Sequence, residues 1–118
     1  MKGVTITIDD YIDIEDFDEP LYKSIGDRVG GFIEIVRLPA HDFSNNKQYC
    51  MVVCDEGVLR GFPVNRIASV LYSDFIVGNA VIMKEGYVNG EPDLVGLDED
   101  DIDIIVDDCF TILEFLKS

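Results

Sequence analysis

A glycine pair, an alternating β-rich run and a proline form the segment that most constrains how this chain folds. The run extends from Gly30 to Pro39 and reads Gly-Gly-Phe-Ile-Glu-Ile-Val-Arg-Leu-Pro. Residues 20–29, which precede it, carry apolar side chains at a spacing of four, the pattern of a short amphipathic helix. Gly30 suits a left-handed helix cap. We therefore predict a core strand that is entered from a helix and ends at the proline.

Within this predicted strand, Glu34 is the one charge on an otherwise apolar face. Arg37 falls on the opposite face, because successive side chains of a strand alternate in direction. Glu34 thus has two alternatives. It lies near a strand end and reaches water, or it is buried and needs a donor such as Asn65 or Arg66.

The remaining chain predicts a small α+β fold. Residues 9–19 are rich in acids, and we expect part of them either to extend the first strand or to form a second short one, and the rest to be a solvated connection. An antiparallel return at Val58–Leu59 and a tight turn at Asn89-Gly90 are also expected. The other predicted strands span 4–8, which should keep one wet face, 48–54 and 75–83, and the other predicted helices span 64–72 and 99–116. We expect one domain, 1–118, with a mostly antiparallel sheet of four to five strands, a long C-terminal helix and one or two short helices.

Charge excludes several partners. The 118 residues contain 24 acidic and 9 basic side chains, for a net charge of −15. Such a field repels the phosphates of nucleic acids and the headgroups of anionic membranes, so direct binding to either is not expected. It favours a basic partner, although acidity also serves solubility. Three cysteines, no apparent leader and no long apolar run lead us to expect reduced thiols in the cytoplasm.

No catalytic or metal-binding constellation stands out. His41 lies in a polar loop, and its neighbour Asp42 is badly placed to orient it as a base. Cys50 and Cys54 share a strand face about 13 Å apart, which suits core thiols better than zinc ligands. The acidic run that begins at Asp98 departs from the calcium-loop pattern, and Asp98 instead suits the N-cap of the helix predicted at 99–116. We therefore expect a protein that is not an enzyme and that has no cofactor.

Polar residues in apolar surroundings are the remaining candidates for binding. Asn65, Arg66 and Asn79 could tie loops to the sheet or face a ligand, and Asn65 also suits the cap of the helix that follows it. Glu34 would join them if the four side chains converge.

Three motifs carry a resemblance to a known family. They are Gly-Gly-Phe-Ile-Glu at 30–34, Gly-Phe-Pro-Val-Asn at 61–65 and Ile-Val-Gly-Asn-Ala-Val at 76–81. Together they resemble a domain family of unknown function found in phage, plasmid and conjugative-element proteins, over about residues 20–105. Phe62 stands where that family usually has leucine. The resemblance implies a mobile-element origin and a small α+β fold, and it adds Pro63, Asn65, Gly78 and Asn79 as candidate site residues.

Three functions remain open at this point. The first is a non-catalytic interaction module of a mobile element, which would bind a basic host protein. The second is a nucleic-acid mimic that inhibits a host DNA-binding or defence enzyme, which requires the acidic stretches 9–19 and 93–108 to be neighbours. The third is a small-ligand binding or sequestering protein, which requires Glu34, Asn65, Arg66 and Asn79 to converge.

Overall fold

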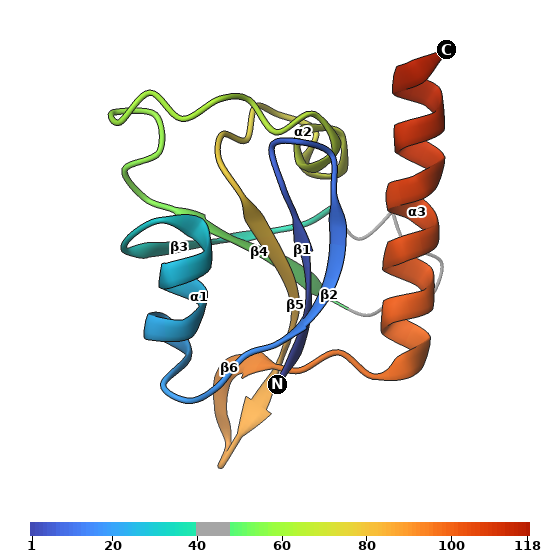
Figure 1. Ribbon diagram of the computed structural model, residues 1–118. Helices are drawn as coiled ribbons and strands as arrows, with labels where there is room; N and C mark the ends of the chain where they lie inside the picture. Colours follow the sequence, from blue (N-terminus) through green and yellow to red (C-terminus); the bar gives the residue numbers. More distant parts are fainter. Residues whose placement is uncertain (40–47) are drawn as a thin grey trace.

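The structure is a computed structural model that describes residues 1–39 and 48–118. Within these residues, six strands form one antiparallel sheet in the order β2-β1-β5-β4-β3, with β6 paired to the outer part of β5 (Figure 1). The chain runs through β1 (Lys2–Ile6), β2 (Ile12–Asp16), α1 (Leu21–Val29), β3 (Ile33–Arg37), β4 (Tyr49–Cys54), α2 (Arg66–Tyr72), β5 (Ala80–Val88), β6 (Glu91–Val95) and α3 (Glu99–Lys117). The α+β class, the antiparallel sheet and the long C-terminal helix are therefore confirmed. The described sheet has six strands, because residues 12–16 and 91–95 each add a short one.

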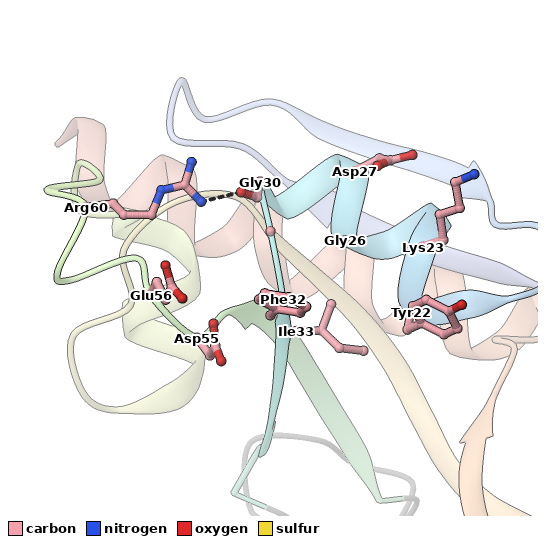
Figure 2. A pocket seen from close by; sticks show the side chains of 11 residues that line it. Tyr22, Lys23, Gly26, Asp27, Gly30, Phe32, Ile33, Asp55, Glu56 and Arg60 are labelled. Carbon is pink, nitrogen blue, oxygen red and sulfur yellow. Dashed lines mark hydrogen bonds between the residues drawn. The ribbon is translucent and has the colours of Figure 1, made fainter.

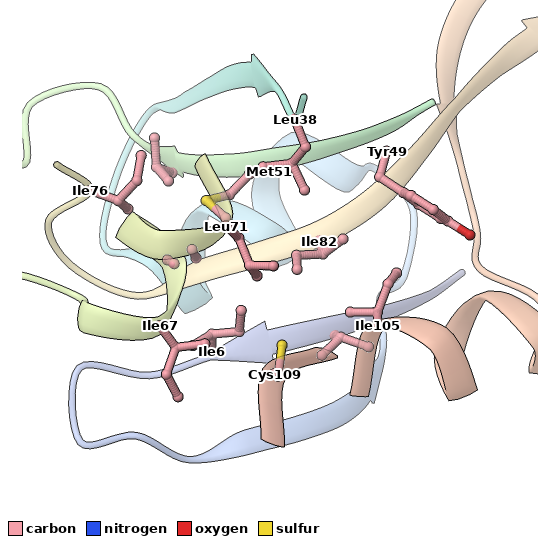
Figure 3. Packing of buried hydrophobic residues seen from close by; sticks show 14 of the residues in the cluster. Ile6, Leu38, Tyr49, Met51, Ile67, Leu71, Ile76, Ile82, Ile105 and Cys109 are labelled. Carbon is pink, nitrogen blue, oxygen red and sulfur yellow. The ribbon is translucent and has the colours of Figure 1, made fainter. Parts of the chain in front are cut away.

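The helices cover opposite faces of the sheet. α2 and α3 pack on one face and enclose the larger apolar cluster, which includes Ile6, Met51, Ile82 and Ile105 (Figure 3). α1 packs on the other face, over a smaller cluster of apolar residues that contains the buried thiols of β4. β4 and the first half of β5 are buried on both faces, so they form the centre of the fold.

Several local predictions are confirmed. Gly30 ends α1 in the left-handed region, with φ of 101°. Asn89 and Gly90 both have positive φ and join β5 to β6, as a tight hairpin turn requires. Asp98 caps α3, and its side chain accepts a hydrogen bond from the Asp101 amide. Asp101 completes a capping box, and its buried carboxylate also accepts hydrogen bonds from Tyr49 and Lys84 at 2.6 and 2.7 Å. α3 is thereby fixed to β4 and β5.

Three predictions are wrong. The strand after the glycine pair is not a core strand but an edge strand, and none of Ile33–Arg37 is fully buried. Val58 and Leu59 lie in a turn with 80% and 89% of their surface exposed, and no strand returns there. The hydroxyl face of β1 is not wet, because Thr5 is fully buried beside Val81 on the α1 side of the sheet. In each case the burial of the residue depends on which distant segments lie beside it, and the local pattern does not show this.

No helix in the described part of the chain is long and apolar enough to cross a membrane.

Candidate functional site

Asn65 is a structural residue. Its side chain is fully buried, and its amide donates to the carbonyls of Ile6 and Gly78, each at 2.9 Å. Its side-chain oxygen accepts from the amide of Ala68 at 3.2 Å and so caps α2. Both of its amide hydrogens and its side-chain oxygen are used to join β1, the 76–79 segment and α2. The helix-cap interpretation is therefore confirmed, and the side chain is buried among these three partners.

Asn79, the polar candidate in the motif at 76–81, also forms its hydrogen bonds within the protein. Asn79 accepts from the Ile8 amide at 3.1 Å and donates to the Arg28 carbonyl at 3.3 Å. Gly78 has φ of 78°, and an added Cβ would lie 2.7 Å from the ring of Phe62. The exposed Pro63 accepts from the Gly78 amide at 2.8 Å. Gly78 and Pro63 thus hold the segments 61–65 and 76–79 together next to the ring of Phe62.

The two charged candidates lie apart from the others. Arg66 is exposed and forms an ion pair with Asp10. Glu34 is exposed and lies opposite Val53, on the sheet face covered by α2 and α3. Asn79 instead reaches α1 on the opposite side. The four residues therefore do not converge, and Glu34 follows the first of its two alternatives and reaches water.

Two buried cysteines have raised pKa values. Burial raises the pKa of Cys109 to about 12, and Asp108 adds to this shift. Burial, together with the nearby charge of Glu85, also raises the pKa of Cys50 to about 12. Both thiols are therefore protonated at neutral pH and are poor nucleophiles. No group of His, Cys, Asp and Glu among the described residues is arranged to hold a metal ion. His41 lies outside the described residues.

Glu15 illustrates how the acidic second strand is held. Burial alone would raise its pKa, but the neighbouring Thr5 hydroxyl and the Arg28 guanidinium lower it on balance. Arg28 donates from Nε to Glu15 at 2.7 Å and from Nη2 to Asp13 at 3.3 Å. One arginine of α1 thus pairs with two carboxylates of β2.

A groove on the α1 side of the molecule is the best candidate site. We call it the α1–β3 groove. One wall is α1, the other is the turn at 55–60, and the start of β3 lies between them (Figure 2). It has a volume of about 920 Å³. Tyr22 and Phe32 line it with 70% and 77% of their surface exposed.

Three carboxylates line the groove together with these two aromatic rings. Asp27, Asp55 and Glu56 line the groove, and none of them forms an ion pair with another described residue. Arg60 lines it too, but its guanidinium donates to the Gly30 carbonyl and stacks 4.7 Å above the ring of Phe62. Arg60 therefore closes the end of α1, and its guanidinium forms no ion pair with the three carboxylates of the lining. Lys23 is the other cation in the lining.

A second depression continues the groove along β3. It has a volume of about 870 Å³, shares Tyr22 and Ile33 with the first, and extends past Ile35 to the β5–β6 hairpin at Tyr87. Continuous apolar surface of this kind, bordered by carboxylates, can hold an elongated segment with apolar and cationic side chains. An aromatic face beside a carboxylate is also a favourable place for an ammonium or guanidinium group.

Sequence reasoning missed this groove. The core strand predicted after the glycine pair includes Phe32, but β3 begins one residue later and leaves the Phe32 ring exposed. A usable signal was the antiparallel pairing of the strands around 33–37 and 49–54, which brings Phe32 opposite Asp55. No comparable pattern in the sequence indicates that α1 lies beside β3 and β4.

The two acidic stretches of the sequence are neighbours, but their carboxylates face different ways. β2 lies beside α3, and Ile12 packs into the cluster beneath that helix (Figure 1). Asp13 and Glu15 point instead to the α1 side, where Arg28 pairs with them. Asp103 and Asp107 of α3 face solvent. The neighbourhood required for nucleic-acid mimicry is present, but a single ridge of free carboxylates across both stretches is not formed.

Comparisons with known proteins agree with the fold. A family model described as "Domain of unknown function (DUF3846)" matches residues 1–110. The match includes the acidic segment 9–19, which the motif resemblance had left outside the shared part. A crystal structure of the small RNA methyltransferase HEN1 is similar, with a TM-score of 0.65 and 16% sequence identity over 90% of this chain. The match covers only 16% of that protein, so the similarity concerns the fold alone. No curated protein sequence matches significantly.

Proposed function

Because the chain belongs to the DUF3846 family of domains of unknown function, whose description names no activity, we propose its role from the geometry of its surface. The protein is a non-catalytic binding module that holds a cationic, partly apolar segment of a partner protein in the α1–β3 groove. The motif resemblance supplies the setting, an accessory protein of a phage, plasmid or conjugative element, and the gene neighbourhoods of family members would test that setting.

One observation carries the proposal. Two aromatic rings, Tyr22 and Phe32, are more than two-thirds exposed in a groove whose carboxylates form no ion pair among the described residues. Exposed large aromatic side chains are costly to leave in water and are typical of interaction sites. The unpaired acids and the net charge of −15 select a basic partner and draw it in from a distance.

The alternatives fit less well. The small-ligand hypothesis required Glu34, Asn65, Arg66 and Asn79 to converge, and they do not. Nucleic-acid mimicry is favoured by the contact between β2 and α3 but disfavoured by the pairing of the β2 acids with Arg28. A mimic would use the outer acids of α3, and this difference allows the two functions to be separated.

The test measures binding of a labelled peptide in which lysine alternates with valine, by fluorescence anisotropy at physiological ionic strength. The groove variant combines Asp55→Asn with Glu56→Gln. Its matched control combines Asp103→Asn with Asp107→Asn, which changes the net charge equally on the opposite side of the sheet. A glutamate–valine peptide of the same length controls for apolar binding alone.

We expect the groove variant to bind about two- to thirtyfold more weakly than the natural chain, since each of the two exposed charge pairs contributes about 0.2–1 kcal/mol. The α3 variant should change the affinity by less than about twofold. Equal losses in the two variants would mean that the overall field, and not the groove, attracts the peptide. A loss confined to the α3 variant would favour mimicry.

A further inference from the structure

The outer edge of β3 carries backbone groups that pair with no strand among the described residues. β3 is the last strand of the sheet, and no described strand pairs with its outer side. On its inner side, Leu38 donates to Tyr49 at 3.0 Å, and Asp55 donates to Phe32 at 2.9 Å. Opposite residues of antiparallel strands alternate between hydrogen-bonded and non-bonded pairs. The inner ladder therefore uses the even-numbered residues of β3.

The odd-numbered residues consequently point their backbone groups outward. The amides and carbonyls of Ile33, Ile35 and Arg37 face away from β4. The side chains of these three residues all line the depression that continues the α1–β3 groove. The free edge and the groove thus meet along one strand.

We propose that the partner segment binds as an additional strand on the outer edge of β3, with alternate side chains in the α1–β3 groove. This inference rests on the proposed function and specifies how the cationic segment is held. Main-chain hydrogen bonds to Ile33, Ile35 and Arg37 give general affinity, and the groove gives selectivity. The same three residues are used whether the added strand is parallel or antiparallel.

The charges of β3 define which segment fits. On the groove side, apolar residues of the partner lie beside Ile33 and Ile35, because those side chains are partly exposed there. Arg37 already pairs with Glu85 at 2.9 Å, so it requires no acidic partner. On the opposite face, Glu34 is exposed and forms no ion pair within residues 1–39 and 48–118. Basic residues of the partner then lie at the even positions, beside Glu34 and, at the groove end of β3, beside Phe32, whose neighbour Asp55 lines the groove.

A second copy of the chain fits this edge poorly. Each copy carries a net charge of −15, so two copies repel each other. A charge on each face of an edge strand, here Glu34 and Arg37, is also a common protection against self-pairing. Glu34 thus both discourages another copy and favours a basic segment.

Amide hydrogen exchange measured by NMR, with and without the lysine–valine peptide, tests the strand addition directly. The amides of Ile33, Ile35 and Arg37 should each exchange at least about tenfold more slowly in the complex. Those of Glu34 and Val36 should change by less than about twofold, since β4 already protects them. If the peptide binds and only the groove variant weakens it, but none of the three odd amides is protected, the strand addition is refuted and the proposed function stands. If the peptide does not bind at all, both are refuted.

Two further comparisons separate backbone from side-chain contributions. Ile35→Pro removes the central outward amide, at a position where an edge strand tolerates proline, whereas Ile35→Thr keeps the amide and the β-branched shape. We expect at least about tenfold weaker peptide binding for Ile35→Pro and less than about threefold for Ile35→Thr. Equal effects would overturn the proposal. Should Ile35→Pro fail to fold, peptides N-methylated at alternate positions replace it, and only one of the two alternating sets should lose binding.

Discussion

Substitution of Asn65 tests whether this residue holds the fold together or serves a ligand. Its amide bridges two carbonyls, those of Ile6 and Gly78, while its oxygen caps α2 at Ala68. Asn65→Asp keeps the capping oxygen, and aspartate caps helices as well as asparagine does. It removes both donors, however, and places a carboxylate against two carbonyl oxygens in a fully buried position.

The magnitude follows from the groups left without partners. A buried polar group that loses its hydrogen bond costs about 1–3 kcal/mol. Asn65→Ala leaves three such groups, so we expect a loss of at least about 3 kcal/mol in the free energy of unfolding. Asn65→Asp should cost at least about 4 kcal/mol, because a buried, unpaired carboxylate adds to the two lost bonds. A domain of 118 residues is stable by roughly 5–15 kcal/mol, so both variants should be strongly destabilised but measurable.

Urea unfolding followed by circular dichroism measures this difference. Arg66→Gln is the matched control, since Arg66 is adjacent but exposed, and loss of its ion pair with Asp10 should cost less than about 1 kcal/mol. The reasoning is refuted if Asn65→Asp unfolds within about 1 kcal/mol of the natural chain. It is also refuted if Asn65→Asp stays stable and loses only peptide binding.

Three further outcomes are expected. Gly78→Ala should cost about 2–4 kcal/mol, because positive φ and a clash with Phe62 combine. Gly61→Ala, which has positive φ but open space, should cost only about 1–2 kcal/mol in the same urea assay. The pKa of Glu15 is lowered in the folded protein, so its contribution to the free energy of unfolding is complete above the ordinary pKa of 4.5 and is lost as the pH falls through the folded-state pKa. The difference in stability between the natural chain and Glu15→Gln should therefore disappear on acidification. A difference that stays constant with pH would contradict this. Cys109 should react with iodoacetamide at neutral pH only as fast as the chain unfolds, and rapid labelling of the folded protein would be inconsistent with its burial.

Local features of this fold were determined by the sequence alone. Gly30 ends α1, Asn89-Gly90 turns the β5–β6 hairpin, and Asp98 caps α3, as each was predicted to do. These features depend on backbone conformations and side-chain oxygens within a few residues of one another. The apolar stripe of α3 likewise needs only the helical repeat to indicate its buried face.

The tertiary structure alone decided which strand lies at the edge and where a binding surface forms. Alternation shows which side chains of 33–37 share a face, but it does not show which strands flank them. Asn65 could be identified as a helix cap, but its bond to the Ile6 carbonyl joins residues 59 positions apart. The groove at Phe32 exists because α1 and the 55–60 turn stand on either side of an edge strand. Contacts between segments distant in sequence set these features, so no local pattern could have predicted them.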